Sequence, residues 1–270
     1  MNTEAENNEL RNSRNPMTVD LFLFMGQSNM AGRGIVTADH PQGAPELIEG
    51  AGYEYRAVSD PDRLCPICEP FGRLENRPGG IDDKDMKTGS LATSFVNAYY
   101  EKTRVPIVGV SASKGGSRID CWQPGTGFLK DAIARMHAAS AFLSANHFLV
   151  RHSFMLWCQG ESDGDISKTG TQYRREFECM LDAMLNEGIE KCFLIRIGRY
   201  NGSGRQDYGE IMAIQDAIAE TNDHVVMVSR SFAEMKERGL MKDDFHYFQE
   251  AYNIIGREAG ENTAHYVLSR

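Results

Sequence analysis

The stretch Phe22-Leu23-Phe24-Met25-Gly26-Gln27-Ser28-Asn29-Met30-Ala31-Gly32-Arg33-Gly34 joins an apolar run to a polar turn. The run over residues 19–25 is typical of a buried strand, and this strand is expected to stop at Gly26. Open α/β sheets bind their ligands at the carboxyl ends of strands, where the polar residues after Gly26 would lie. Ser28 is therefore expected at this edge, with its hydroxyl exposed and its backbone N–H directed into the same space.

This stretch taken alone also fits two simpler interpretations. A phosphate-binding glycine loop is one, but the spacing matches neither G-x-G-x-x-G nor G-x-x-x-x-G-K-[ST]. A plain strand-to-helix turn with Ser28 as its N-cap is the other, and it is the simpler account of these residues by themselves. The remainder of the chain decides between a cap and a nucleophile.

Composition limits the possible partners. The chain has 270 residues, 41% of them hydrophobic and 25% charged, which is ordinary for a globular protein. The net charge of −9 argues against nucleic acid or an anionic membrane surface as a partner. No apolar run approaches the ~20 residues of a membrane-spanning helix. A neutral or weakly charged substrate is the easier expectation.

The N-terminal segment, residues 1–16, is polar and lacks the apolar core of a signal peptide. We expect a disordered lead-in there and a single domain over residues 17–270. As written, the chain is expected to be cytoplasmic, and a secreted or periplasmic protein whose signal was removed is the alternative. Cys65 and Cys68 form a C-x-x-C pair, but no second pair of ligands at similar spacing follows, so no metal site is expected.

Apolar strands alternate with amphipathic helices over most of the chain. This pattern predicts a three-layer α/β/α sandwich around a mostly parallel sheet of about five strands. Residues 35–90 are rich in Pro, Gly and Asp and form a long excursion with one strand candidate at 53–58. Because the excursion leaves the sheet beside Ser28, it is expected to wall a substrate cleft. The other expected strands are 106–110, 153–158, 191–197 and 224–228, and the expected helices are 89–102, 128–145, 173–187, 208–220 and 248–267.

Three further segments carry polar groups that can reach the same edge. Gly115 and Gly116 follow one strand, and a glycine pair lets a backbone N–H approach a ligand. Gln159 follows the next strand and can present its amide to the cleft, and Glu161 can anchor that loop. Each also has a structural explanation, as a flexible turn or a solvated side chain.

Asp243 and His246 stand three residues apart just before the last expected helix. On a tight turn the Asp243 carboxylate can accept the Nδ1 proton of His246 and leave Nε2 free for a serine. Asp244 is the competing carboxylate. The turn geometry favours Asp243, because residues three apart share a side of a helical turn, whereas an extended backbone would favour Asp244.

These four motifs, Gly26-Gln27-Ser28-Asn29, Gly115-Gly116-Ser117 with Trp122, Gln159-Gly160-Glu161-Ser162-Asp163 and Asp243-x-x-His246, occur in an order that resembles the SGNH-hydrolase superfamily. Within it they are similar to the sialate O-acetylesterase and acetylxylan-esterase branch, carbohydrate esterase family six. The resemblance implies the flavodoxin-like SGNH fold, a Ser28, His246 and Asp243 triad, and an oxyanion hole of Ser28, Gly116 and Gln159. Gln27, Asn29 and Glu161 would support substrate or loops. Cys158 and Asp244 depart from the usual pattern.

The resemblance implies a serine esterase that removes O-acetyl groups from carbohydrate, with no metal or organic cofactor. The acetylated xylan, sialic acid or related glycan and the oligomeric state stay open. Two alternatives use the same fold. One is a non-catalytic carbohydrate-binding domain, and the other is a lipase- or thioesterase-type hydrolase of another acyl ester.

Overall fold

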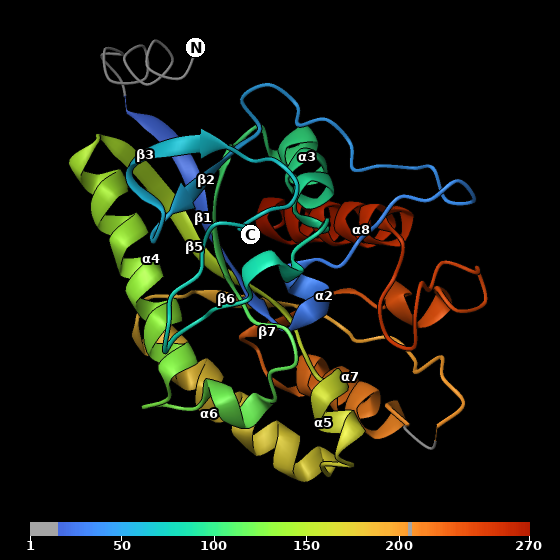
Figure 1. Cartoon of the computed structure of the whole chain (residues 1–270). Coiled ribbons are helices and arrows are strands. Elements are labelled where there is room, and N and C mark those ends of the chain that lie inside the picture. Colours follow the sequence, from blue (N-terminus) through green and yellow to red (C-terminus); the bar gives the residue numbers. More distant parts are fainter. Residues whose placement is uncertain (1–15, 205–206) are drawn as a thin grey trace.

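The computed structural model describes residues 16–204 and 207–270. It contains one seven-stranded sheet in the order β3-β2-β4-β1-β5-β6-β7 (Figure 1). β3 runs antiparallel to β2, and all other neighbouring strands are parallel. The strands are β1 (Met17–Gly26), β2 (Gly52–Arg56), β3 (Asp60–Pro66), β4 (Ile107–Ser113), β5 (Phe148–Cys158), β6 (Lys191–Ile195) and β7 (Val225–Ser229).

Helices cover both faces of the sheet, which confirms the predicted three-layer α/β/α architecture. The side chains of α3 and α8 pack on one face, and those of α4, α6 and α7 pack on the other. The longer helices are α3 (Ala92–Thr103), α4 (Gly127–Ala145), α6 (Gly170–Asn186), α7 (Gly209–Thr221) and α8 (Gln249–Leu268). The short ones are α2 (Ser28–Ala31), α5 (Glu161–Asp165), η1 (Lys84–Met86), η2 (Ile119–Trp122) and η3 (Ser231–Glu234).

The predicted number of about five strands is too low. The strand candidate at 53–58 corresponds to β2, and β3, which was not expected, pairs with β2 at the edge of the sheet. β3 has no apolar alternation to reveal it, since its first four residues are at least partly exposed. It also contains Pro61 and Pro66, which are tolerated at a sheet edge where no neighbour needs their missing N–H. The expected lead-in over residues 1–16 lies, except for Pro16, outside the described residues.

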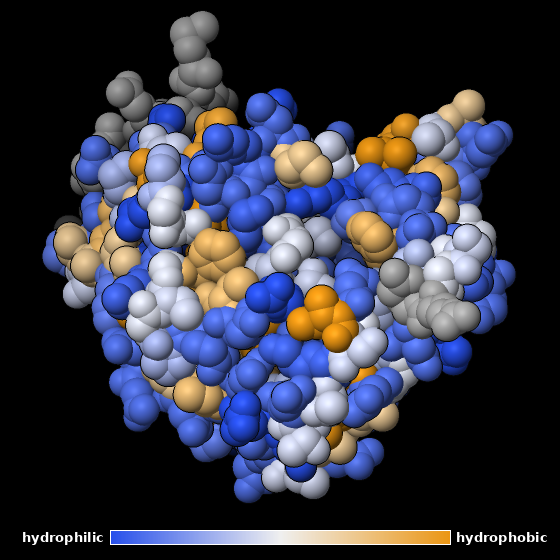
Figure 2. Space-filling model, turned by 60° about the horizontal axis from the view of Figure 1, so that its bottom comes forward, coloured by the Kyte–Doolittle hydropathy of each residue, from blue (hydrophilic) through white to orange (hydrophobic). Residues whose placement is uncertain are grey.

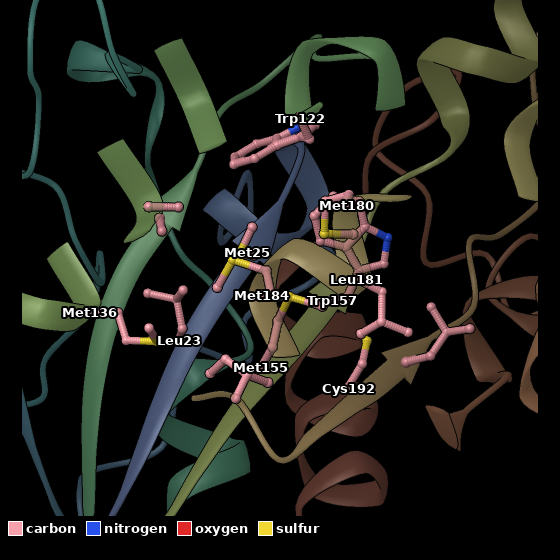
Figure 3. Close-up of a cluster of buried hydrophobic side chains, with 14 of the residues drawn as sticks. Leu23, Met25, Trp122, Met136, Met155, Trp157, Met180, Leu181, Met184 and Cys192 are labelled. Carbon is pink, nitrogen blue, oxygen red and sulfur yellow. The ribbon is translucent and has the colours of Figure 1, made fainter. Parts of the chain in front are cut away.

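β1 lies in the middle of the sheet and divides the core in two. Alternate side chains of a strand point to opposite faces. Accordingly Leu21, Leu23 and Met25 join the cluster under α4, α6 and α7, while Phe22 and Phe24 join the cluster under α3 and α8. Figure 3 shows part of the first cluster, in which Met25 of β1 lies among apolar side chains of the neighbouring strands and helices. This burial on both faces fixes the position of the residues that follow β1.

Three strands end side by side at the carboxyl edge of the sheet. Gly26 of β1 is in register with Ser113 of β4 on one side and with Cys158 of β5 on the other. Gly26 has a φ of 140°, and a Cβ there would lie 2.0 Å from the carbonyl oxygen of Cys158. Only glycine fits this close approach. The segments that follow β1, β4 and β5 are thereby brought together.

The excursion between α2 and α3 leaves the sheet and returns to its starting point. Its two ends are joined by hydrogen bonds from Gly34 N to Gly89 O (2.8 Å) and from Thr88 N to Gly32 O (3.2 Å). Within it lie β2, β3 and η1. Over the two described ranges, none of the helices combines the length and apolar content needed to cross a membrane.

Candidate active site

Ser28 begins α2 directly after the central strand, in what we call the nucleophile turn, residues 26–32. Its Oγ lies 2.9 Å from Nε2 of His246. The turn is closed by Gly32 N, which donates to Ser28 O at 2.9 Å. Ser28 is only 6% exposed, and it lines the pocket described below. The nucleophile and its partner therefore meet although 218 positions separate them in the sequence.

His246 belongs to the histidine loop, residues 243–246, which precedes α8. Its Nδ1 lies 3.0 Å from Asp243 Oδ2. The other oxygen of Asp243 accepts hydrogen bonds from the backbone N–H groups of Phe245 (3.0 Å) and His246 (2.7 Å). Asp244 instead accepts from the hydroxyl of Tyr200 at 3.1 Å. The structure thus places Asp243, and not Asp244, against the histidine, as the turn geometry predicts.

The electrostatics of the loop suit a base that is neutral near pH 7. Burial lowers the pKa of His246 below its usual value, although the Asp243 carboxylate acts in the opposite direction. Burial acts to raise the pKa of Asp243, but its hydrogen bonds from the Phe245 N–H and from His246 outweigh this and lower it. Asp243 is therefore ionised when His246 is neutral, and the pair is oriented so that Nε2 can accept the serine proton.

Asn29 connects the nucleophile turn to three other segments. Its Nδ2 donates to Glu161 Oε1 (2.6 Å) and to the carbonyl oxygen of Phe245 (3.0 Å). Its Oδ1 accepts from the hydroxyl of Tyr252 on α8 at 2.6 Å. Asn29 is completely buried, so these bonds hold the histidine loop at a fixed distance from Ser28. Tyr252 was not singled out from the sequence, where it is one of several apolar-face residues of its helix.

Gln27 makes the corresponding connection to the segment after β5. Its Oε1 accepts from the backbone N–H groups of Gly160 (3.1 Å) and Ser162 (3.3 Å) and from Gln159 Nε2 (3.2 Å). Gln27 and Asn29 were expected to support the site, and their described contacts are of this kind. Both side chains act within the protein, because neither amide is left free.

Glu161 is a buried carboxyl at the edge of the pocket. Its Oε1 is bonded to Asn29, whereas no described residue forms a hydrogen bond with its Oε2. Burial raises the pKa of Glu161 to about 7. Glu161 therefore anchors the Gln159-Gly160-Glu161 segment to the nucleophile turn, and its charge state changes within the physiological pH range.

Gly116 lies on the loop that follows β4, and its backbone faces open space. It has a φ of +68°, and a Cβ there would meet no atom within 4 Å. Among residues 16–204 and 207–270, no acceptor is found for its N–H or for that of Ser28. Both residues line one pocket with His246, so their backbone N–H groups are candidate donors to a ligand beside the serine hydroxyl.

Gln159 lies elsewhere than its expected role in an oxyanion hole requires. It is completely buried, and its Nε2 is within hydrogen-bond distance of Gln27 Oε1, Ser117 O (3.1 Å) and Asp163 Oδ2 (2.5 Å). Its side chain is not among those that line the pocket. An amide carries only two N–H bonds, and both are used inside the protein, so this expectation is wrong for the described geometry. Gln159 instead ties the Gly116–Ser117 segment to the nucleophile turn.

Two functional candidates were missed in the sequence. Arg33 donates to Asp83 Oδ2 at 2.6 Å, and both side chains are buried beside Ser28. Lys114 reaches the other oxygen of Asp83 at 3.4 Å. The available signals were Arg33 in the glycine-rich stretch after Ser28 and an acidic pair that includes Asp83 in the excursion. Sequence spacing alone does not predict that two residues 50 positions apart form an ion pair.

The pocket around Ser28 has a volume of about 260 Å³. Its walls come from the nucleophile turn, the excursion, the loop after β4, α5 and the histidine loop. A larger hollow of about 430 Å³ lies beside α7, but its described lining contains no serine, cysteine or histidine. No three His, Cys, Asp or Glu side chains of the described ranges are grouped so that they would hold a metal ion. The smaller pocket is therefore the candidate active site.

Comparisons with known proteins identify the family and the fold of the chain. The sequence profile of a family described as "carbohydrate esterase, sialic acid-specific acetylesterase" matches residues 18–265. No curated protein matches the chain in sequence.

Three solved structures share the fold. A protein from Arabidopsis thaliana has a TM-score of 0.67 at 20% identity, over 94% of this chain and 99% of its own. NanS has a TM-score of 0.60 at 13% identity, over 96% and 100%. A protein described as a novel carbohydrate acetylesterase from Xanthomonas citri has a TM-score of 0.59 at 15% identity, over 93% of this chain and 57% of its own. At these identities the likeness establishes the fold.

Proposed function

The chain belongs to the carbohydrate esterase family of sialic acid-specific acetylesterases, and from this we propose that it is a serine esterase that removes O-acetyl groups from carbohydrate. The observation that carries the proposal is the continuous chain of contacts from Ser28 Oγ to His246 Nε2 and from His246 Nδ1 to Asp243. Each contact is within the distance over which a proton is transferred. In that chain the serine is the nucleophile, the histidine is the base and the aspartate orients the histidine.

The first half of the proposed reaction forms an acetyl-enzyme. His246 Nε2 accepts the Ser28 proton as Oγ attacks the acetyl carbonyl carbon, and the negative charge moves to the carbonyl oxygen. The backbone N–H groups of Ser28 and Gly116 are the donors proposed to stabilise this oxyanion. When the intermediate collapses, the bond to the sugar oxygen breaks and the imidazolium returns its proton to that oxygen.

The second half repeats these steps with water. His246 accepts a proton from the water as its oxygen attacks the acetyl carbonyl, and the Ser28–acetyl bond breaks with proton return to Oγ. The products are acetate and the free serine. Every group used belongs to the chain, and the ionised Asp243 stabilises the imidazolium in both halves.

The small size of the pocket supports a small acyl group. About 260 Å³ is slightly below the usual range of small-molecule sites, roughly 300–1,000 Å³. The face shown in Figure 2 is mostly hydrophilic, with its hydrophobic residues in small separate groups. A long fatty-acyl chain would need a continuous apolar groove, so we rank a lipase-type activity below acetyl removal.

The proposal is tested by measuring acetate release from a panel of acetylated xylan, sialic acid and related glycans with the wild type and Ser28→Ala. We expect the wild type to release acetate from at least one glycan and the variant to be slower by several orders of magnitude. Ser28→Ala removes one oxygen from a turn held by other bonds, so it should remain folded. No acetate release by the wild type from any glycan or from p-nitrophenyl acetate would favour a non-catalytic carbohydrate-binding domain.

A further inference from the structure

The excursion contributes one buried carboxylate, Asp83, to the pocket that Ser28 and Gly116 line. Asp83 immediately precedes η1, and its side chain is only 2% exposed. Its Oδ1 accepts a hydrogen bond from the backbone N–H of Gly115 at 3.0 Å. Its Oδ2 accepts from Arg33 Nη2 at 2.6 Å. Because the Asp83 carboxylate is buried, water cannot readily take the place of these protein donors.

Gly115 adjoins one proposed oxyanion donor directly, and Arg33 is linked to the other through the nucleophile turn. Gly115 precedes Gly116, so the bond to Gly115 N fixes the peptide plane that leads into Gly116. Arg33 follows Gly32, whose N–H closes the turn onto Ser28 O, and Arg33 Nη1 also donates to Gly32 O at 3.2 Å. Asp83 therefore connects the nucleophile turn to the loop after β4 through one carboxyl group.

The packing around Gly115 shows how little freedom this connection has. A Cβ at Gly115 would lie 2.3 Å from Arg33 Nη2 and 3.0 Å from Asp83 Oδ1. The Gly115 backbone thus lies directly against the ion pair, and a side chain there would have to displace the Arg33 guanidinium. Gly116, in contrast, has open space where its Cβ would be. The loop is held at Gly115 and presents Gly116 to the pocket.

Asp83 itself is held by the excursion. Its backbone N–H donates to Asn76 Oδ1 at 3.0 Å. On the other side of η1, the buried ammonium of Lys87 donates to Ser111 Oγ on β4 (2.8 Å) and to Gly72 O (2.9 Å). The residues on both sides of η1, Asp83 and Lys87, are therefore attached to other segments of the chain.

From this geometry we infer that Asp83 is a positioning residue that sets the distance and direction between the Ser28 and Gly116 N–H groups, so that both point at the oxyanion. The inference rests on the proposed function, because it assigns a purpose to Asp83 only if an oxyanion forms beside Ser28. It explains why the long excursion returns to the site instead of ending at the edge hairpin.

The test compares Asp83→Asn and Asp83→Ala with Asp82→Ala, a matched control whose ion-pair partner is Lys84 at 4.0 Å. For each folded variant, kcat and KM are measured with p-nitrophenyl acetate, and the inhibition constant of phenylboronic acid is determined. Boronic acids form a tetrahedral adduct on the serine and so report on the oxyanion donors. Thermal unfolding identifies variants that do not fold.

We expect Asp83→Asn to lower kcat by ~10- to 100-fold, less than the ~10²–10³ loss of a whole donor, with KM changed less than about twofold. The boronic acid should bind more weakly by a similar factor, and Asp82→Ala should resemble the wild type. A folded Asp83→Asn with unchanged kcat, or with lower kcat and unchanged boronic acid affinity, would overturn the inference. Because wild-type activity is measured alongside, such a result leaves the proposed function standing, whereas an inactive wild type removes both.

Discussion

The nucleophile turn and the histidine loop contribute to the same pocket but are held in different ways. Gln27, Ser28 and Asn29 are all buried. The side-chain amide of Gln27 bonds to the segment after β5, and that of Asn29 bonds to α8. In the histidine loop, Asp243 is 42% exposed and Phe245 is 37% exposed. Most hydrogen bonds of Asp243 stay within the loop itself.

This difference indicates which substitutions change stability and which change activity alone. The nucleophile turn continues a strand buried on both faces, so a cut in its hydrogen-bond network leaves buried polar groups without partners. The histidine loop lies at the surface, where solvent can replace a lost partner.

The largest effect on activity should come from a substitution in the histidine loop. His246→Ala removes the proposed base, and kcat should fall by ~10⁴–10⁶ as in other serine hydrolases. Because His246 bonds mainly to Asp243 and Ser28, the free energy of unfolding should change by less than ~1 kcal/mol. Steady-state kinetics and urea unfolding measure both quantities. A large loss of stability would show that the His246 side chain is also needed to hold the fold together, contrary to this contrast.

Asp243→Asn is expected to lower kcat by ~10⁴, since an amide favours the wrong tautomer of the histidine. Asp244→Asn is the matched control, because Asp244 is adjacent but accepts from Tyr200. It should change kcat by less than about threefold. Steady-state kinetics of the two variants decide between the carboxylates, and a severe loss at Asp244 with a mild one at Asp243 would reverse the assignment.

The comparison also shows where prediction from sequence succeeds. Ser28, Gly116 and His246 line one pocket, with Asp243 against His246, because each segment follows a strand or precedes the last helix, positions that the alternating pattern predicts. β3 was missed because an exposed edge strand with two prolines carries no periodic signal. The role of Gln159 was misassigned because Asp163, one helical turn later, competes for its amide, and competition between acceptors depends on side-chain direction. Asp83 lies in the excursion, and no local sequence pattern predicts that this part of the excursion lies beside Ser28.

Substitutions in the buried hydrogen-bond network around the nucleophile turn should lower stability more than activity. Gln159→Ala leaves Asp163 Oδ2 and Ser117 O without this donor, so the free energy of unfolding should fall by ~1–3 kcal/mol. The kcat of the folded fraction should fall less than the ~10² expected for an oxyanion donor. Denaturant unfolding and kinetics normalised by active-site titration separate the two effects. A loss of kcat near 10³ with unchanged stability would restore Gln159 as a direct donor.

Glu161, which is bonded to the nucleophile turn, should make the free energy of unfolding depend on pH. Its folded-state pKa is raised from 4.5 to about 7, so the folded protein keeps a proton that the unfolded chain releases. The stabilisation from this proton is complete below about pH 4.5 and is lost as the pH rises through 7. Relative to Glu161→Gln, the wild type should therefore lose up to about 3 kcal/mol of unfolding free energy over this interval. Parallel curves for the two proteins, measured by urea unfolding at several pH values, would contradict the assigned shift.

The central claim is that Ser28, activated by His246, forms the covalent intermediate. The most direct measurement is mass spectrometry of the protein after reaction with a fluorophosphonate, which labels activated serines, in the wild type, Ser28→Ala and His246→Ala. We expect one adduct in the wild type, on the peptide that contains Ser28, with loss of esterase activity in proportion to labelling. We expect no adduct in Ser28→Ala and labelling slowed by orders of magnitude in His246→Ala. An adduct on another serine that accounts for the loss of activity would contradict the claim.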